Sequence, residues 1–152
     1  IHLIEQSIIR LMLSLPTKKM EAALSDRFNA SMREEIDNIR DFVILHYHAT
    51  ARKDSAFWRY CKDMPIPDSL QARMDQFAQS GHVYQGNGEL FGEASWLQVM
   101  LGQGITPKAY HPIVDLMPEQ ELAKFLASVK QQTERRVNQL PNHLDFIRHY
   151  CQ

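Results

Sequence analysis

The sequence predicts an all-α fold, an irregular bundle of about six helices with long loops. Apolar residues recur at spacings of three and four along most of the chain, as on one face of a helix. Capping residues, prolines and glycines separate these periodic stretches and indicate where helices begin and end. Strict alternation of apolar and polar residues, which would predict strands, is never sustained.

The first two helices are predicted from their apolar stripes. The first helix is expected to end at Pro16, and its stripe consists of Ile1, Ile4, Ile8, Leu11, Met12 and Leu15. A polar loop runs from Pro16 to Leu24, and Ser25 is a suitable N-cap for the next helix. That helix spans roughly Asp26 to Thr50, with a stripe made of Phe28, Met32, Ile36, Ile39, Val43 and Tyr47.

Three shorter helices follow. Asp54 or Ser55 can cap the first of them, which carries Phe57, Trp58 and Cys61. Asp68 or Ser69 can cap the second, which carries Leu70, Met74 and Phe77. After an irregular loop over residues 81–90, a third helix is expected from Phe91 to Leu101 and stops at the glycines of residues 102–104.

Two further helices are expected near the end of the chain. A second irregular stretch contains Pro107 and Pro112, and Pro118 suits the first turn of a helix. The stripe of that helix consists of Leu122, Phe125, Leu126, Val129 and Val137. Pro141 ends it, and Asn142 or the residue before it starts a last helix with Leu144, Ile147 and Tyr150.

Size and composition are those of one soluble globular domain. Of the 152 residues, 44% are hydrophobic and 23% are charged. A net charge of −1 and the lack of a lysine or arginine run exclude nucleic acid and acidic membranes as expected partners. No apolar run approaches the roughly 20 residues that span a bilayer. Cys61 and Cys151 lack CxxC spacing, which predicts free thiols in a reducing cytoplasm.

Chemistry-bearing motifs are scarce. The seven histidines show no zinc-like spacing, and His46 and His48 point to different faces of a helix, so no metal is expected. The carboxylates Glu34, Glu35 and Asp37 are interpreted as a solvated face that can pair with neighbouring arginines. The glycines of residues 86–88 lack phosphate-loop spacing, and no serine lies in a GxSxG motif. The sequence therefore gives no catalytic residue.

Aromatic residues are the remaining signal, and they allow two interpretations. They are numerous in the loop-rich middle of the chain: Phe57, Trp58, Tyr60, Tyr84, Phe91, Trp96 and Tyr110. They can fill the core between short helices. Alternatively, some of Tyr84, Phe91 and Trp96 can line a slot for a flat ring, because aromatic rings stack on one another.

Four segments in order resemble one known family. The segment from Arg40 to Leu70 places Tyr47 and a Phe-Trp pair around a charged cluster and ends in a proline-bounded turn. IHLIEQSIIRL, FGEASWLQVMLGQGITPKAYHPIVD and LPNHLDFIRHYC match further segments. Together they resemble the C-terminal helical part of flavin-dependent halogenases of the tryptophan halogenase family. Since the chain starts at Ile1 without a cap, we expect residues 1–152 to be the C-terminal helical region of a larger protein.

The resemblance implies a partly helical, flavin-monooxygenase-like enzyme. Reduced FAD, supplied by a separate flavin reductase, would react with oxygen and then with chloride or bromide. The resulting hypohalous acid would reach a lysine near the substrate, and with the help of a glutamate an electron-rich aromatic ring would be halogenated. The GxGxxG loop, the WxWxIP motif, the lysine and the glutamate precede the matched region. The N-terminal flavin module is therefore the implied partner, and this chain alone is expected to be inactive.

The resemblance also suggests site residues. Ile1 matches an isoleucine beside the flavin ring, Phe91 a residue that sandwiches the substrate ring, and Ser95 a nearby polar partner. With Tyr84 and Trp96, Phe91 and Ser95 are the predicted substrate-binding residues. The paired tyrosines of tryptophan-specific members are not evident in this sequence. The implied substrate is therefore not limited to tryptophan and can also be another indole, a phenol or a pyrrole.

The alternative is a free-standing helical interaction module without enzymatic activity. It predicts a cooperatively folded, monodisperse chain. A piece of a halogenase should instead expose the apolar face of its first helix and tend to associate.

Overall fold

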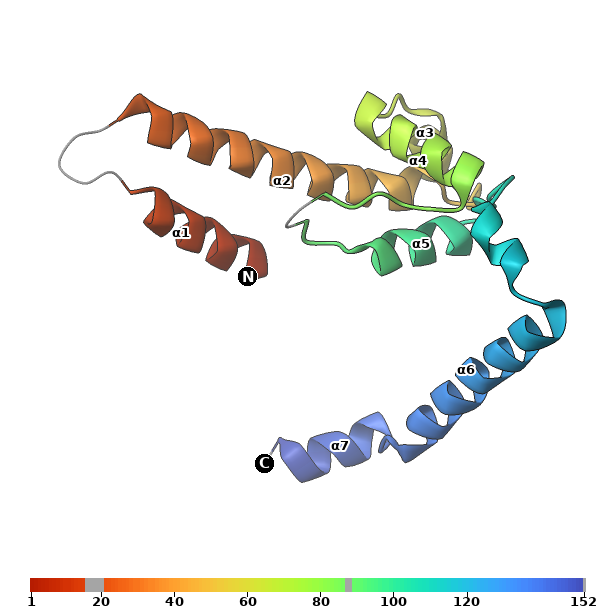
Figure 1. Cartoon of the computed structure of the whole chain (residues 1–152). Helices are drawn as coiled ribbons and strands as arrows, with labels where there is room; N and C mark the ends of the chain where they lie inside the picture. Colours follow the sequence, from red (N-terminus) through yellow and green to blue (C-terminus); the bar gives the residue numbers. More distant parts are fainter. Residues whose placement is uncertain (16–20, 87–88, 152) are drawn as a thin grey trace. The chain divides into compact units, whose positions relative to one another are not determined.

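The computed structural model describes residues 1–15, 21–86 and 89–151, and it is helical throughout, with no strand among these residues. Within them lie seven α-helices and one 3₁₀ helix, which confirms the predicted all-α class (Figure 1). The chain divides into two compact units, Ile1–Tyr110 and His111–Gln152. Pro16, which we expected to end the first helix, lies outside the described residues.

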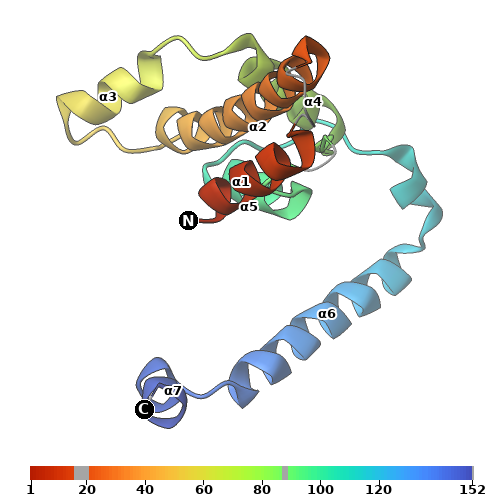
Figure 2. The same cartoon turned by 90° about the vertical axis from the view of Figure 1, so that its left-hand side faces the viewer.

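The first unit is built around one long helix. It contains α1 (His2–Ser14), α2 (Ala22–His48), α3 (Ala56–Asp63), α4 (Asp68–Ser80) and α5 (Glu93–Gly102). Helix α1 lies along the N-terminal half of α2, and α3, α4 and α5 contact α2 as well (Figures 1 and 2). Helix α2 is therefore the scaffold that holds the other four together.

The core of the first unit lies between the C-terminal half of α2, α4 and α5. Its most deeply buried side chains are each less than 2% exposed: Leu45, Leu70, Phe77, Val83, Trp96 and Met100. Burying a large apolar side chain stabilises a fold by about 1.5–3 kcal/mol. These six side chains are thus the main source of stability of the first unit.

The predicted stripe of α2 is not the face that the core uses. Ile36, Val43 and Tyr47 remain 40–51% exposed, whereas Phe42 and Leu45 are buried. Instead, α4 and α5 pack against the face that carries Phe42 and Leu45. The C-terminal part of the stripe is left open on the surface.

The predicted caps are confirmed for two helices and wrong for two. Ser55 accepts a hydrogen bond from the backbone N–H of Trp58 at the start of α3, as expected. Ser25 is no cap, because α2 already begins at Ala22. Neither Asp68 nor Ser69 caps α4, whose N-cap is Pro67; the Ser69 hydroxyl instead donates to the Asp41 carboxylate on α2.

Two glycines end helices in the left-handed region of backbone conformation. Gly81 follows α4 with a φ of 68°, and a Cβ there would lie 3.2 Å from the Ala109 carbonyl oxygen. Gly104 follows α5 with a φ of 86°. Helix α5 ends at Gly102, as predicted, but it begins at Glu93, so Phe91 precedes the helix.

Two carboxylates of α2 are buried, and for one of them, Glu35, this contradicts the predicted solvated face of Glu34, Glu35 and Asp37. Glu35 is 5% exposed and forms an ion pair with Arg10 of α1, which ties α1 to α2. Asp41 is 4% exposed and accepts hydrogen bonds from Arg40 and Ser69. Asp37 pairs with Arg40 at 2.7 Å on the surface, as helical spacing predicted.

The second unit is helical, and its described residues form no buried core. It consists of η1 (Pro112–Leu116), α6 (Glu119–Gln139) and α7 (His143–Tyr150). Asn142 caps α7 by accepting a hydrogen bond from the Asp145 N–H, as predicted, whereas Pro118 is the N-cap of α6 and not part of its first turn. Among the described residues of this unit no side chain is buried. The predicted apolar stripe lies on α6, but no described side chain of this unit is buried against it.

Candidate aromatic-binding groove

An open apolar groove lies on the first unit where the exposed part of the α2 stripe meets α3 and the segment before α5. Its volume is about 460 Å³. We call it the aromatic groove and define it by its lining residues: Phe42, Val43, His46, Tyr47, Trp58 and Phe91. The lining consists mostly of apolar side chains and flat aromatic rings. Such a lining favours an aromatic ligand over a charged one.

Two stacked ring pairs form much of the lining. The Phe42 and Phe91 rings lie 4.1 Å apart at an angle of 24°, so Phe91 is anchored on a core residue. The Tyr47 and Trp58 rings lie 5.8 Å apart at 17°. The groove is therefore lined by rings that other rings already hold in place.

Helical spacing brings the α2 residues of the groove together. Phe42 and His46 are four residues apart, as are Val43 and Tyr47, so the two pairs occupy adjacent rows on one side of α2. On α3, the Ser55 cap fixes the first turn and with it Trp58. The Arg52 guanidinium lies 4.5 Å from the centre of the Trp58 ring and covers one of its faces.

His46 is a polar group inside this apolar lining. Its Nδ1 lies 2.7 Å from the Phe42 carbonyl oxygen, and its ring stands edge-on to the Phe42 ring at 4.7 Å. These two contacts hold the imidazole in one orientation. Tyr47 contributes a hydroxyl to the lining, and the other lining side chains are hydrocarbon or indole.

A partly buried ion pair lies close in sequence to Phe91. The Arg73 guanidinium donates to both oxygens of Glu89 at 2.8 and 3.0 Å and lies 4.3 Å from the centre of the Trp96 ring. Glu89 also accepts the Gly86 N–H at 3.0 Å. Because Glu89 lies two residues before Phe91, this bidentate pair fixes the segment that presents Phe91 to the groove.

The predicted substrate-binding residues are not all in the groove. Phe91 lines it, and both Phe91 and Trp96 contact Phe42, but Trp96 is only 1% exposed and belongs to the core. Ser95 is half-buried on α5 and is not among the lining residues. Tyr84 is 61% exposed and stands edge-on to His82. Ile1, predicted to lie beside a flavin, is fully exposed.

Sequence reasoning missed most of the groove. Val43 and Tyr47 were assigned to a helix stripe, and Trp58 to aromatic residues that can fill the core. Phe42 was not singled out, and His46 was considered only as a metal ligand. The available signal was the pair of i, i+4 spacings in FVILHY, since it places two aromatic rings and an imidazole on one helix side. The close approach of α3 and the Phe91 segment to that side required the structure.

The resolved pKa shifts belong to arginine–aspartate pairs outside the lining. The hydrogen bond from Arg52 holds the pKa of Asp54 below its usual range and raises the pKa of Arg52. The hydrogen bond to Asp41 likewise raises the pKa of Arg40. These groups stay ionised at neutral pH.

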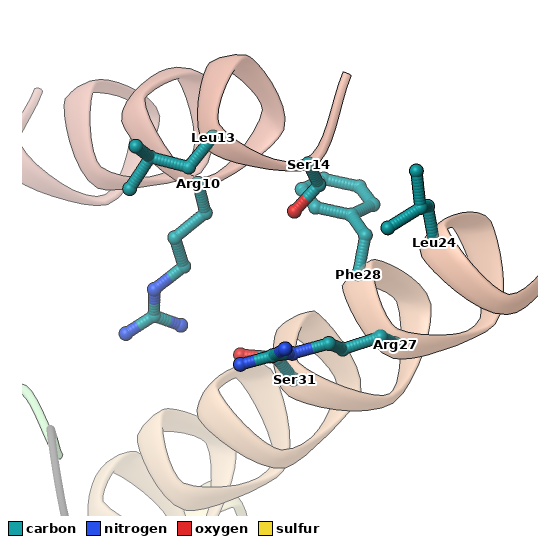
Figure 3. A pocket seen from close by; sticks show the side chains of 7 residues that line it. All are labelled: Arg10, Leu13, Ser14, Leu24, Arg27, Phe28 and Ser31. Carbon is teal, nitrogen blue, oxygen red and sulfur yellow. The ribbon is translucent and has the colours of Figure 1, made fainter. Parts of the chain in front are cut away.

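A second hollow lies between α1 and the start of α2 (Figure 3). It has a volume of about 330 Å³ and is lined by Arg10, Leu13, Ser14, Leu24, Arg27, Phe28 and Ser31. Arg10 is already neutralised by buried Glu35. We therefore favour the aromatic groove as the functional site.

Metal and membrane features are not seen in the part of the chain that the structure describes. No group of three or more histidine, cysteine, aspartate or glutamate side chains there could hold a metal ion. Searched over the same residues, no helix is long and apolar enough to cross a bilayer.

The helical fold agrees with comparisons to known proteins. The sequence profile of the tryptophan halogenase family matches residues 1–119. The chain therefore belongs to the tryptophan halogenase family.

Solved structures support the same assignment. A flavin-dependent halogenase from Xanthomonas campestris is 50% identical, with a TM-score of 0.89 over 98% of this chain and 30% of that one. A flavin-dependent halogenase from a Brevundimonas species is 34% identical, with a TM-score of 0.87 over 96% of this chain and 30% of that one. Among curated relatives, the tryptophan 7-halogenase of a Kutzneria strain is 28% identical over 93% of this chain and 30% of its own length. The chain thus spans about a third of the length of these relatives.

Proposed function

We propose that this chain forms the helical, substrate-side part of a flavin-dependent halogenase that chlorinates or brominates an electron-rich aromatic ring, such as tryptophan or another indole. The observation that carries the proposal is the match to halogenases over nearly all of this chain and only about 30% of theirs. The activity then belongs to the whole protein. This chain supplies part of the substrate site and no catalytic lysine or glutamate.

The aromatic groove is the place we propose for the substrate ring. Phe91 supports this role, because the family resemblance assigns it to ring stacking and its own ring lies in the lining. Trp96 then acts behind the groove as a core residue, and Ser95 and Tyr84 stay proposals for contacts to the rest of the substrate.

FAD and the halide are proposed to be held by the remainder of the protein. Reduced FAD, together with oxygen, would supply the oxidant that converts the halide into a halogenating species. In this chain Ile1 is the proposed flavin contact, and a single fully exposed side chain cannot cradle a flavin. A separate flavin reductase is the proposed source of reduced FAD.

The exposed face of α1 supports a larger protein around this chain. Ile4, Ile8 and Met12 are 54–65% exposed on one helix face. A contiguous apolar face of this kind marks a contact surface. We propose that the flavin module of the same protein covers it. The two cysteines are free thiols, in keeping with a cytoplasmic location.

The experiment compares this chain with the same chain joined to its upstream part. With FAD, a flavin reductase, chloride or bromide, and indole, we expect no halogenation by the chain alone and turnover by the joined protein. Halogenation of indole by the chain alone would contradict the proposal. So would an upstream sequence without GxGxxG and WxWxIP motifs. In the joined protein, Phe91→Ala should raise the KM for the aromatic substrate, whereas Phe125→Ala, in the other unit, should not.

A further inference from the structure

We propose that His46 is a specificity-determining residue of the aromatic groove, which accepts a hydrogen bond through Nε2 from a ring N–H or O–H of the bound aromatic. The inference rests on the proposed function and names the substrate class more narrowly. Aromatic compounds with such a donor, including indoles, pyrroles and phenols, would be preferred over rings of the same shape without one.

The tautomer of His46 follows from its backbone contact. A carbonyl oxygen can only accept, so Nδ1 must carry the hydrogen in its 2.7 Å contact with the Phe42 oxygen. In the neutral ring Nε2 then has a lone pair and no hydrogen. The side of the imidazole turned away from its own helix backbone is thus an acceptor.

This acceptor is accessible and has no partner within the described residues. The hydrogen bond of His46 runs through Nδ1 to the backbone, and Nε2 is not among the buried side-chain atoms that lack a partner. A half-buried ring in a groove wall with an accessible nitrogen can be reached by a ligand in that groove. The edge-on contact with Phe42 limits rotation of the ring, so the acceptor is pre-oriented.

The surroundings make the hydrogen bond selective. Phe42, Val43 and Phe91 offer no hydrogen-bonding side-chain group, and Trp58 carries only a donor N–H. The Tyr47 hydroxyl is the other group in the lining that could accept. A ligand lacking a donor would displace water from Nε2 without replacing its hydrogen bond. A net hydrogen bond of ordinary strength gives a preference of about three- to tenfold.

The test measures the affinity of this chain for indole and for benzofuran by isothermal titration calorimetry. The two compounds have nearly the same shape, but benzofuran has a ring oxygen where indole has its N–H. We expect indole to bind about three- to tenfold more tightly. His46→Phe should remove the preference, His46→Gln should restore part of it through its amide oxygen, and His143→Phe, in the other unit, should leave it unchanged.

Nitrogen chemical shifts of the histidine rings provide a second readout. In long-range proton–nitrogen NMR spectra, the free chain should show His46 with its hydrogen on Nδ1, and indole should shift the Nε2 signal whereas benzofuran should not. Equal binding of both compounds, or an indole preference that persists in His46→Phe, would overturn the role of His46 and leave the groove intact. If neither compound binds, both the inference and the proposed substrate groove fail. A retained preference in His46→Phe together with its loss in Tyr47→Phe would assign the acceptor to Tyr47 instead.

Discussion

The two units of this chain contain similar amphipathic helices, yet among the described residues only those of the first form a buried core. In the first unit Leu45, Leu70 and Trp96 are nearly inaccessible to solvent. In the second, Phe125, Leu126 and Leu144 on equally clear helical stripes are 57–63% exposed. An apolar stripe therefore predicts a helix but not what covers it, because burial depends on a second apolar surface. The first unit supplies such surfaces from α2, α4 and α5.

The largest expected difference between the units is the cost of removing a large apolar side chain. Trp96→Ala should lower the free energy of unfolding of the first unit by about 3–5 kcal/mol, because it leaves a cavity among buried side chains. Phe125→Ala, in the second unit, should change the free energy of unfolding by less than about 0.5 kcal/mol. Urea unfolding followed by circular dichroism measures both. Equal losses would show that the second unit is as well packed as the first.

Breaking an ion pair should also cost more stability in the first unit than in the second, although the difference is smaller than for apolar side chains. Glu89→Gln breaks the bidentate pair with Arg73, whose side chain is only 17% exposed, and should cost about 3 kcal/mol. Asp145→Asn removes the exposed partner of Arg148 and should cost at most about 1 kcal/mol. Thermal unfolding of the two variants at the same salt concentration provides the comparison. A neutral Glu89→Gln variant would remove the support that we assign to the Phe91 segment.

Helix caps provide a matched pair of substitutions in the two units. Ser55→Ala removes the cap of α3 and should lower the stability of the first unit by about 1 kcal/mol. Asn142→Ala removes the cap of α7 and should reduce the helix content of residues 143–150 without moving the main unfolding transition. Residue-specific carbon chemical shifts separate the two effects. A shift of the main transition in Asn142→Ala would couple the two units energetically.

The smallest expected effect is the pH dependence contributed by Asp54. Its folded-state pKa is lowered by the hydrogen bond from Arg52, so its contribution to stability is present above the unfolded pKa near 3.8. That contribution is lost as the pH falls through the lowered folded pKa. The stability difference between wild type and Asp54→Asn should therefore be largest near neutral pH and shrink below about pH 4. A constant difference from pH 7 to pH 2 would contradict the hydrogen-bond assignment.

The sequence predicted the helices far better than it predicted burial. Ser55 and Asn142 were identified as caps because their side chains bond to nearby backbone groups, which is a local interaction. Ser25 failed as a cap because α2 begins three residues earlier. Glu35 was assigned to a solvated face, since nothing in the local pattern shows that Arg10 of another helix reaches it.

The candidate site was predicted only in part for the same reason. Phe91 was identified through the family resemblance, and it lines the groove. Trp96 was grouped with it because both are aromatic and close in sequence. Phe91 and Trp96 are nevertheless five residues apart, on either side of the start of α5. Phe91 lines the groove, whereas Trp96 is buried in the core. His46 was considered only as a possible metal ligand. The structure shows its Nδ1 in contact with the Phe42 carbonyl oxygen, which suggests a ligand contact through Nε2.

Hydrogen exchange of this chain with and without indole tests the central claim most directly, namely that the first unit is a folded platform with an aromatic-binding groove. We expect strong protection of the backbone of α2, α4 and α5 around Leu45, Leu70 and Met100, and rapid exchange across α6 and α7. Indole should add protection around residues 42–47, 58 and 91 and leave residues 119–150 unchanged. Uniformly rapid exchange in the first unit, or added protection confined to α6 and α7, would contradict the account.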